Sequence, residues 1–139
     1  FLFSKQIDIR LLLPASSVGL LSAAVLNLNN MRDLESDKKS NKYTLAGYMG
    51  RKNSKVYHFS LILSAIALMI VFQGIMSFSY LMLFTWVAFA PLLIHLKIVY
   101  GIKNPKRFDP HLKLVALSTF VMSLLFASVL VIEQLQQLS

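Results

Sequence analysis

A short polar segment, residues 29–42, carries the side chains best suited to chemistry in this 139-residue sequence. If the segment is helical, Asn29, Asp33 and Asp37 stand four residues apart and share one face, with Asn30 beside them. Two carboxylates at this spacing repel each other and weaken a bare helix by about 0.2–0.5 kcal/mol. A positive charge is therefore expected between the two aspartates.

The residue types favour a hard divalent cation that is bound together with phosphate. Mg²⁺ takes one or two carboxylate oxygens, keeps several waters and completes its octahedron with substrate phosphate oxygens. Arg32 and Lys42, with Lys38 and Lys39, could hold the outer phosphate oxygens. Glu35 falls on another face of the helix, where Lys39 is its expected partner. On spacing alone, a solvated loop whose charges only set membrane topology is an equally good interpretation.

The rest of the chain has the composition of a membrane protein. Apolar residues make up 56% of it and charged residues 14%, against about 45–50% and about 25% in ordinary soluble domains. Residues 56–96 contain no Asp, Glu, Lys or Arg, and one helix of that length would be about 60 Å long, twice the thickness of a bilayer core. A break near residues 74–79 divides this stretch into two spans, and uncharged runs at 11–28 and 114–132 predict two more.

These runs predict an all-α integral membrane bundle of four transmembrane helices, at about 11–28, 56–76, 80–100 and 112–132, with residues 29–55 as a catalytic cytoplasmic loop. Cysteine is absent, which excludes disulfide frameworks, Cys-based zinc sites and thiol nucleophiles. A net charge of +8 on so hydrophobic a chain indicates membrane loops and no nucleic-acid partner. A buried soluble helical core is the less favoured alternative.

The positive charges predict the orientation of the bundle. Of the 14 basic residues, Lys5 and Arg10 precede the first span, and the other 12 lie in or beside the segments that join the first span to the second and the third to the fourth. By the positive-inside rule both of these segments face the cytoplasm. We therefore expect a multi-pass protein of the inner (plasma) membrane with its active-site loop in the cytoplasm.

Taken together, the polar segment resembles the second aspartate-rich motif of the UbiA superfamily of membrane prenyltransferases. The paired Asn before Arg-Asp and the later Lys-x-Thr-Leu are most similar to the MenA branch, which prenylates 1,4-dihydroxy-2-naphthoate in menaquinone synthesis. Further similarity extends over most of the chain. The residues that carry the resemblance are Asn29-Asn30-Met31-Arg32-Asp33, Asp37, Lys42-x-Thr44-Leu45-Ala46 and Gly50, with 20–27, Tyr57-His58 and 90–93 outside the motif.

The resemblance implies an all-helical domain of nine transmembrane helices, of which residues 1–139 form the C-terminal part and correspond to the last four helices. It also implies the reaction, which is Mg²⁺-dependent transfer of a polyprenyl group from polyprenyl diphosphate to 1,4-dihydroxy-2-naphthoate. The substrates would meet in the lipid bilayer, with the diphosphate at its cytoplasmic side.

The resemblance further implies roles for six residues. Asp33 and Asp37 would be the catalytic carboxylates that hold Mg²⁺ against the diphosphate, and an asparagine before them would orient a metal-bound water. Basic residues after and within the motif would bind the diphosphate itself. The implied metal-binding set is Asp33, Asp37, Asn29 and Asn30, and the implied diphosphate-binding set is Arg32 and Lys42.

Two departures from the family pattern matter. Asn41 stands where family members usually carry Gly, but Asn tolerates left-handed backbone better than most residues, so the turn should survive. No first aspartate-rich motif is present, since Asp8, Asp109 and Glu133 are isolated in the sequence. We expect that motif in a missing N-terminal half, and this chain alone to be inactive.

Two alternatives to this function remain. The same chemistry could act on another aromatic acceptor, such as 4-hydroxybenzoate. A non-enzymatic transport or scaffold module could instead bind a cation at Asp33 and Asp37. Transport sites usually lie near the bilayer midplane on interrupted helices, whereas these acids lie at the end of a span, which favours the enzyme.

The polar side chains within the spans are expected to be mainly structural. His58 and His95 suit hydrogen bonding near the membrane boundary more than catalysis, and Gln73 suits a contact between helices. Pro91 should bend the third span. The basic loop 103–113 either contacts anionic lipid headgroups or only sets topology.

Overall fold

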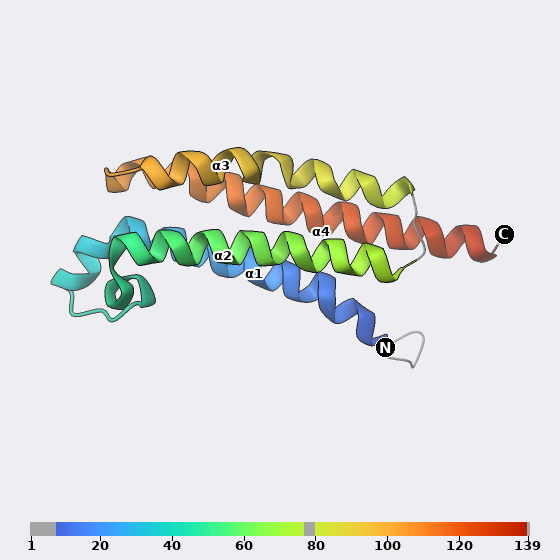
Figure 1. The fold of residues 1–139 in the computed structure, drawn as a ribbon, viewed down its shortest axis with the longest axis horizontal. Helices are drawn as coiled ribbons and strands as arrows, with labels where there is room; N and C mark the ends of the chain where they lie inside the picture. Colours follow the sequence, from blue (N-terminus) through green and yellow to red (C-terminus); the bar gives the residue numbers. More distant parts are fainter. Residues whose placement is uncertain (1–7, 77–79, 139) are drawn as a thin grey trace.

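The computed structural model describes residues 8–76 and 80–138, which form four long helical rods (Figure 1). Each rod runs antiparallel to the one before it, so that α1 begins and α4 ends at the same end of the bundle (Figure 1). The elements in chain order are η1 (Ile9–Leu11), α1 (Leu12–Lys39), α2 (Leu45–Ile75), η2 (Tyr80–Ala88), α3 (Ala90–Gly101), η3 (Pro105–Phe108) and α4 (Asp109–Leu138), where η denotes a 3₁₀ helix.

Among the described residues, four helical segments are long and apolar enough to cross a membrane: Ile9–Lys39, Leu45–Ile75, Tyr80–Gly101 and Pro105–Gln136. The predicted all-α membrane bundle with four spanning helices is therefore confirmed. At about 1.5 Å per residue, the 28 residues of α1 reach about 42 Å, which exceeds a bilayer core of about 30 Å. The end of α1 can therefore extend beyond the hydrocarbon as a rigid helix.

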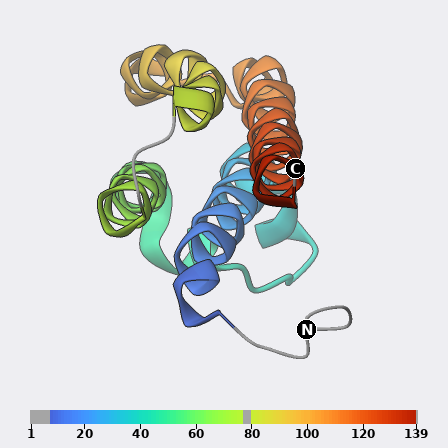
Figure 2. The same ribbon diagram turned by 90° about the vertical axis from the view of Figure 1, so that its right-hand side faces the viewer.

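Helix α1 lies between α2 and α4, and the rod formed by η2 and α3 packs against α4 (Figure 2). Leu21, Leu28 and Met31 of α1 are fully buried in this core, whereas Ile94 and Phe120 on the outside are each 63% exposed. Apolar side chains thus cover both the interior and the surface of the bundle. A helix that is apolar all round belongs in a large core or in lipid, and lipid is the solvent that suits these exposed faces.

Polar side chains tie the helices together. Gln73 of α2 accepts a hydrogen bond from the Trp86 indole Nε1 of η2 at 2.8 Å and donates to the Met82 carbonyl at 3.3 Å, which confirms the expected contact between helices. Ser17 of α1 donates to the Ala65 carbonyl of α2 at 2.9 Å. Lipid provides little hydrophobic drive for helix association, so such bonds and close packing fix the register.

Three histidines form a second tie across α2, α3 and α4. The Nε2 atoms of His58 and His95 are hydrogen-bonded at 2.7 Å, and the Nδ1 atoms of His95 and His111 at 3.0 Å. His58 and His95 are fully buried. Their expected hydrogen-bonding role is therefore confirmed, and His111, which no sequence pattern singles out, completes the chain of rings.

The breaks in the rods follow local sequence. Helix α2 ends at Ile75 with extended backbone at Met76, which lies inside the break expected at 74–79, while residues 77–79 lie outside the described residues. Pro91 occupies one of the first two positions of α3, where a missing N–H costs no helical hydrogen bond. The third span changes from 3₁₀ helix to α-helix just before this proline.

The expected loop 29–55 consists of the end of α1, a turn at residues 40–44 and the start of α2. Thr44 caps α2 by accepting a hydrogen bond from the Gly47 N–H at 3.1 Å. Gly50 then interrupts the helix with φ 75° and ψ 163°, a backbone conformation that is essentially restricted to glycine. Gly50 thus sets the angle at which the turn meets the main body of α2.

We expect Gly50→Ala to destabilise the complete protein by about 1–3 kcal/mol, because an L side chain is strained at this backbone conformation. Gly19→Ala is the matched control, since Gly19 is helical and nothing lies within 4 Å of an added Cβ. Alanine is favoured over glycine inside a helix by about 0.5–1 kcal/mol. Thermal unfolding in detergent should therefore show a lower Tm for the first variant and an unchanged or higher Tm for the second.

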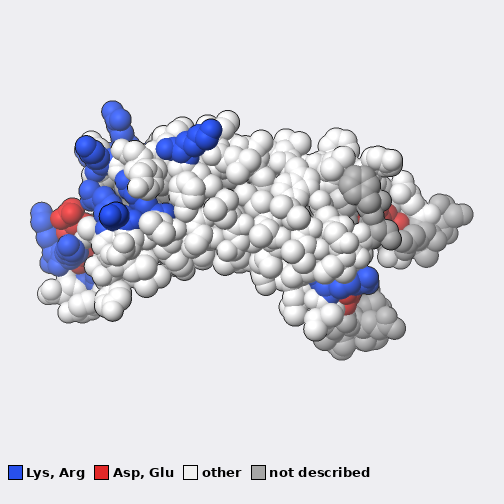
Figure 3. Space-filling view, in the orientation of Figure 1, with Lys and Arg blue, Asp and Glu red and all other residues white. Residues whose placement is uncertain are grey.

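Basic side chains gather at one end of the bundle, where α1 ends and α2 begins (Figure 3). The opposite end carries Arg10, which is paired with Asp8 at 2.7 Å, while Lys5 lies outside the described residues. The distribution of charge along the bundle is therefore strongly one-sided.

Candidate metal and diphosphate site

The site residues lie on the last three turns of α1, at the basic end of the bundle. Because α1 is one regular helix from Leu12 to Lys39, Asn29, Asp33 and Asp37 follow one another at single-turn intervals on one face. Tertiary packing against α2 and α4 supports this stretch: Met31 is fully buried and Leu34 is almost so. The sequence-predicted face therefore exists, and it is held by a buried apolar stripe beside it.

Arg32 joins three oxygen-bearing side chains. Its Nε and Nη2 donate to the two carboxylate oxygens of Asp33 at 2.8 and 2.9 Å, a bidentate pair. Nη2 also donates to Asn29 Oδ1 at 2.7 Å, and Nη1 donates to Asp109 Oδ1 of α4 at 2.9 Å. A positive charge is expected between the two aspartates, but the structure gives each its own cation, Arg32 at Asp33 and Lys42 at Asp37. The guanidinium of Arg32 also links α1 to α4.

Asp37 is buried, with 7% of the residue exposed. Its Oδ1 pairs with Lys42 Nζ at 3.2 Å, while its Oδ2 is buried and makes no hydrogen bond. An unsatisfied buried carboxylate oxygen is costly, and it leaves one acceptor of this side chain available to a further donor or cation. Asn30 is half-buried on the neighbouring part of the helix.

The turn after α1 explains why Lys42 reaches Asp37. The Asn41 N–H donates to the Lys38 carbonyl at 3.3 Å, and the Lys42 N–H donates to the Asp37 carbonyl at 2.9 Å, which together form a Schellman motif. That motif needs left-handed backbone at its C′ residue, and Asn41 has φ 52°. The prediction that Asn would preserve a turn usually made by glycine is therefore confirmed.

A cavity of about 510 Å³ opens beside this turn. Its wall includes the side chains of Lys38 and Lys42, which carry ammonium groups. Lys42 also pairs with the buried Asp37, so the cavity lies close to that carboxylate. Tyr43 and Tyr48 add largely exposed aromatic rings to its rim. A cavity with two cations and aromatic walls can accept an anionic group that carries an apolar substituent.

Comparison with known proteins assigns the chain to a family. Residues 1–117 match the pattern of the UbiA prenyltransferase family. The chain belongs to this family. It is 33% identical over 127 residues to the 1,4-dihydroxy-2-naphthoate octaprenyltransferase of Haemophilus influenzae, an alignment that covers 91% of this chain and 41% of that protein.

A second UbiA-type relative gives the same picture. The chain is 34% identical over 119 residues to the 1,4-dihydroxy-2-naphthoate octaprenyltransferase of Escherichia coli, covering 84% of this chain and 38% of that protein. The chain thus spans about two fifths of the length of these relatives. No solved structure matches it significantly.

The oxygen-bearing side chains of this UbiA-type site fit a hard cation. Mg²⁺ prefers carboxylate and amide oxygens, which Asn29, Asp33 and Asp37 supply, and Asp37 Oδ2 has no partner. The oxygens of Asp33 and Asn29 accept from Arg32, so a metal would exchange with the guanidinium there. Within the part of the chain that the structure describes, no cluster of three or more His, Cys, Asp or Glu is placed to hold a metal. The residues therefore suit a metal that takes part of its ligands from elsewhere.

Two charged contacts at the site escape sequence reasoning. Asp109, isolated in the sequence, meets Arg32 across 77 residues. The ion pair that the structure gives to Glu35 is with Arg51 of α2, at 3.7 Å, whereas its helical spacing favours Lys39. Both contacts join different helices at the basic end of the bundle, so the four-helix topology is the signal that could have suggested them.

Proposed function

We propose that this chain forms part of a Mg²⁺-dependent enzyme that transfers a polyprenyl group from its diphosphate to 1,4-dihydroxy-2-naphthoate. Membership of the UbiA prenyltransferase family carries this proposal, and the names of both relatives support the acceptor. The site geometry supports it further, since Asp33 and Asp37 follow each other on one face of α1 with Arg32 and Lys42 beside them. The proposal concerns the complete protein.

In this proposal Asn29, Asp33 and Asp37 would hold Mg²⁺, and Asn30 would orient a bound water. The ion would supply positive charge that stabilises the departing diphosphate. Arg32 and Lys42, which neutralise Asp33 and Asp37 in this structure, would bind the diphosphate oxygens once the carboxylates are engaged.

The chemistry breaks the allylic C–O bond of the donor and forms a C–C bond to the aromatic ring. Diphosphate leaves with the electron pair of the C–O bond, and the ring loses its carboxylate as CO₂ where the prenyl carbon attaches. Preorganised positive charge aimed at the leaving group lowers this barrier. The apolar bundle around α1 keeps water from the electron-poor prenyl carbon.

We further propose that the basic end of the bundle faces the cytoplasm at the inner (plasma) membrane. The one-sided charge in Figure 3 supports this orientation through the positive-inside rule. The diphosphate would then meet Asp33 and Asp37 beyond the hydrocarbon core, while the isoprenoid tail lies along the lipid-facing helices.

The test is a prenylation assay with the complete protein in detergent. With octaprenyl diphosphate and Mg²⁺, we expect 1,4-dihydroxy-2-naphthoate to be prenylated and 4-hydroxybenzoate to be left unreacted, with products identified by mass spectrometry. Chelating Mg²⁺ with EDTA should abolish turnover and re-adding it should restore turnover. Preferred prenylation of 4-hydroxybenzoate would show that it, and not 1,4-dihydroxy-2-naphthoate, is the acceptor. Full activity in EDTA would contradict the metal assignment.

A further inference from the structure

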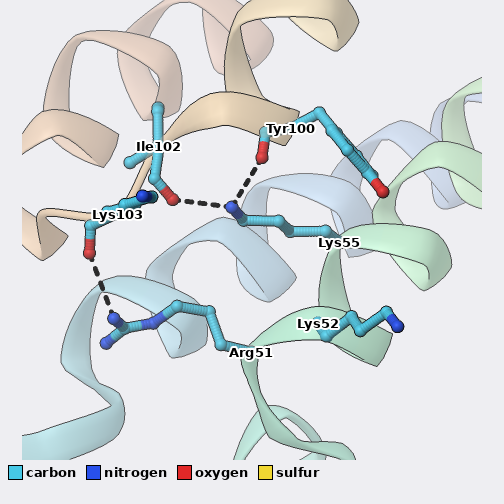
Figure 4. A pocket seen from close by; sticks show the side chains of 6 residues that line it. All are labelled: Arg51, Lys52, Lys55, Tyr100, Ile102 and Lys103. Carbon is cyan, nitrogen blue, oxygen red and sulfur yellow. Dashed lines mark hydrogen bonds between the residues drawn. The ribbon is translucent and has the colours of Figure 1, made fainter.

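A second cavity at the basic end lies between α2 and the end of α3 (Figure 4). Its volume is about 390 Å³. Four of its six lining residues are cationic, and none is acidic. They are Arg51, Lys52, Lys55, Tyr100, Ile102 and Lys103.

Two of these cations are anchored by the end of α3. Lys55 Nζ donates to the carbonyls of Tyr100 and Ile102 at 2.8 and 2.6 Å, and Arg51 Nη1 donates to the Lys103 carbonyl at 3.1 Å (Figure 4). The Tyr100 carbonyl belongs to the last turn of α3, where carbonyls lack partners within the helix and attract cations, and Ile102 and Lys103 directly follow the helix. The bonds therefore position positive charge at one wall of the cavity.

The charge of the cavity is only partly balanced. Arg51 has a carboxylate neighbour, Glu35, at 3.7 Å, and its Nε is buried without a hydrogen bond. Lys52 and Lys103 form no ion pair with any side chain in the described part of the chain. Like charges gathered in one cavity repel each other, and a bound anion would relieve that repulsion.

The place of the cavity in the bundle selects the kind of anion. It lies at the end of two membrane-spanning helices, and exposed apolar side chains continue from it along both of them, including Val56 and Ile98. Basic pockets between transmembrane helices at the membrane surface bind anionic lipid headgroups. A phosphate that carries acyl chains would fill the cavity and cover these apolar faces at once, which a free phosphate cannot do.

We propose that this cavity binds the headgroup phosphate of an anionic phospholipid. Arg51, Lys52, Lys55 and Lys103 supply the charge, and the acyl chains lie along the outer faces of α2 and α3. This site is separate from the aspartate face of α1 and does not depend on the proposed prenyl transfer.

The test measures lipid binding to the complete protein by native mass spectrometry. We expect phosphatidylglycerol to bind in preference to phosphatidylcholine. The double variant Lys52→Gln/Lys103→Gln should weaken phosphatidylglycerol binding about 10- to 30-fold, because each cation near an anionic headgroup contributes several-fold to binding. Lys52 and Lys103 are chosen because their side chains make none of the bonds that anchor the end of α3. The bond from Arg51 goes to the backbone carbonyl of Lys103, which glutamine keeps.

The matched control is Lys97→Gln/Lys113→Gln, which removes two charges from exposed positions outside this cavity and should change binding less than about twofold. Equal loss in both double variants would show a diffuse charge effect and overturn the proposal, as would unchanged binding in the cavity variant. Inorganic phosphate at the same concentration should not displace the lipid. If it does, the site takes free phosphate and the lipid assignment is wrong. Circular dichroism spectra should show that both variants are folded.

Discussion

Asp37→Asn in the complete protein is expected to lower prenyl transfer about 10²–10³-fold, the usual cost of removing one preorganised charge contact from a transition state. Asp37 is buried, with one oxygen on Lys42 and the other unpartnered. Asparagine keeps the shape of the side chain and an oxygen for Lys42, but it loses the charge that would hold the metal. The same substitution at Asp33 should have a similar effect. Rates are measured with saturating octaprenyl diphosphate and Mg²⁺.

Glu35→Gln is the control for this experiment, because Glu35 is an exposed acid of the same helix whose ion pair is with Arg51. Exposed ion pairs contribute only about 0–1 kcal/mol, so this variant should keep near-normal turnover. Near-normal turnover of Asp37→Asn would show that Asp37 is not a metal ligand. This outcome is distinct from failure of the proposed function, because the unsubstituted protein would still carry out prenylation.

Arg32→Gln is expected to have two opposite effects. Without the guanidinium, Asp33 loses its bidentate partner, so Mg²⁺ binding in the absence of donor should become about fivefold tighter, about 1 kcal/mol. Prenyl transfer should nevertheless fall about 10²-fold, because the same side chain is proposed to hold the diphosphate. Isothermal titration with Mg²⁺ measures the first effect and the prenylation assay the second.

Lys39→Gln removes the same charge from an exposed position of the same helix and serves as the control for Arg32→Gln, because Lys39, unlike Lys38 and Lys42, does not line the cavity beside the turn. It should change neither measurement by more than about twofold, as is usual for surface charges. If Arg32→Gln instead weakens Mg²⁺ binding, Arg32 supports the metal site structurally and does not compete with the metal. Unchanged transfer in Arg32→Gln would exclude its role with the diphosphate.

The helices were predictable because the bilayer imposes a simple rule on the sequence. Long uncharged runs must be spanning helices, and the continuation of α1 as a helix through Asp37 puts the predicted residues on one face. The turn after α1 was predictable from residue type: Asn41 adopts the left-handed backbone that its place in the turn requires. Each of these inferences depends on neighbours in sequence.

The partners that residues find on other helices were not predictable in this way, although Gln73 could be expected to make such a contact. The Arg32–Asp109 pair and the joining of His95 to His111 depend on how far each helix slides and rotates against the next. That register is set by side-chain packing over the whole interface, which no local spacing encodes. Glu35 shows the limit well, since it pairs with Arg51 of a neighbouring helix.

The unbroken course of α1 from the middle of the bundle to Asp37 links the acidic residues mechanically to the surrounding membrane. A rigid rod longer than the hydrocarbon layer responds to a thicker or thinner membrane by changing its tilt. Each change in tilt moves Asp33 and Asp37 relative to the aqueous boundary, where the proposed function would bring a water-soluble ion together with a lipid-borne substrate. Under that proposal, the fatty-acid composition of the host membrane becomes a determinant of how well the two are brought together.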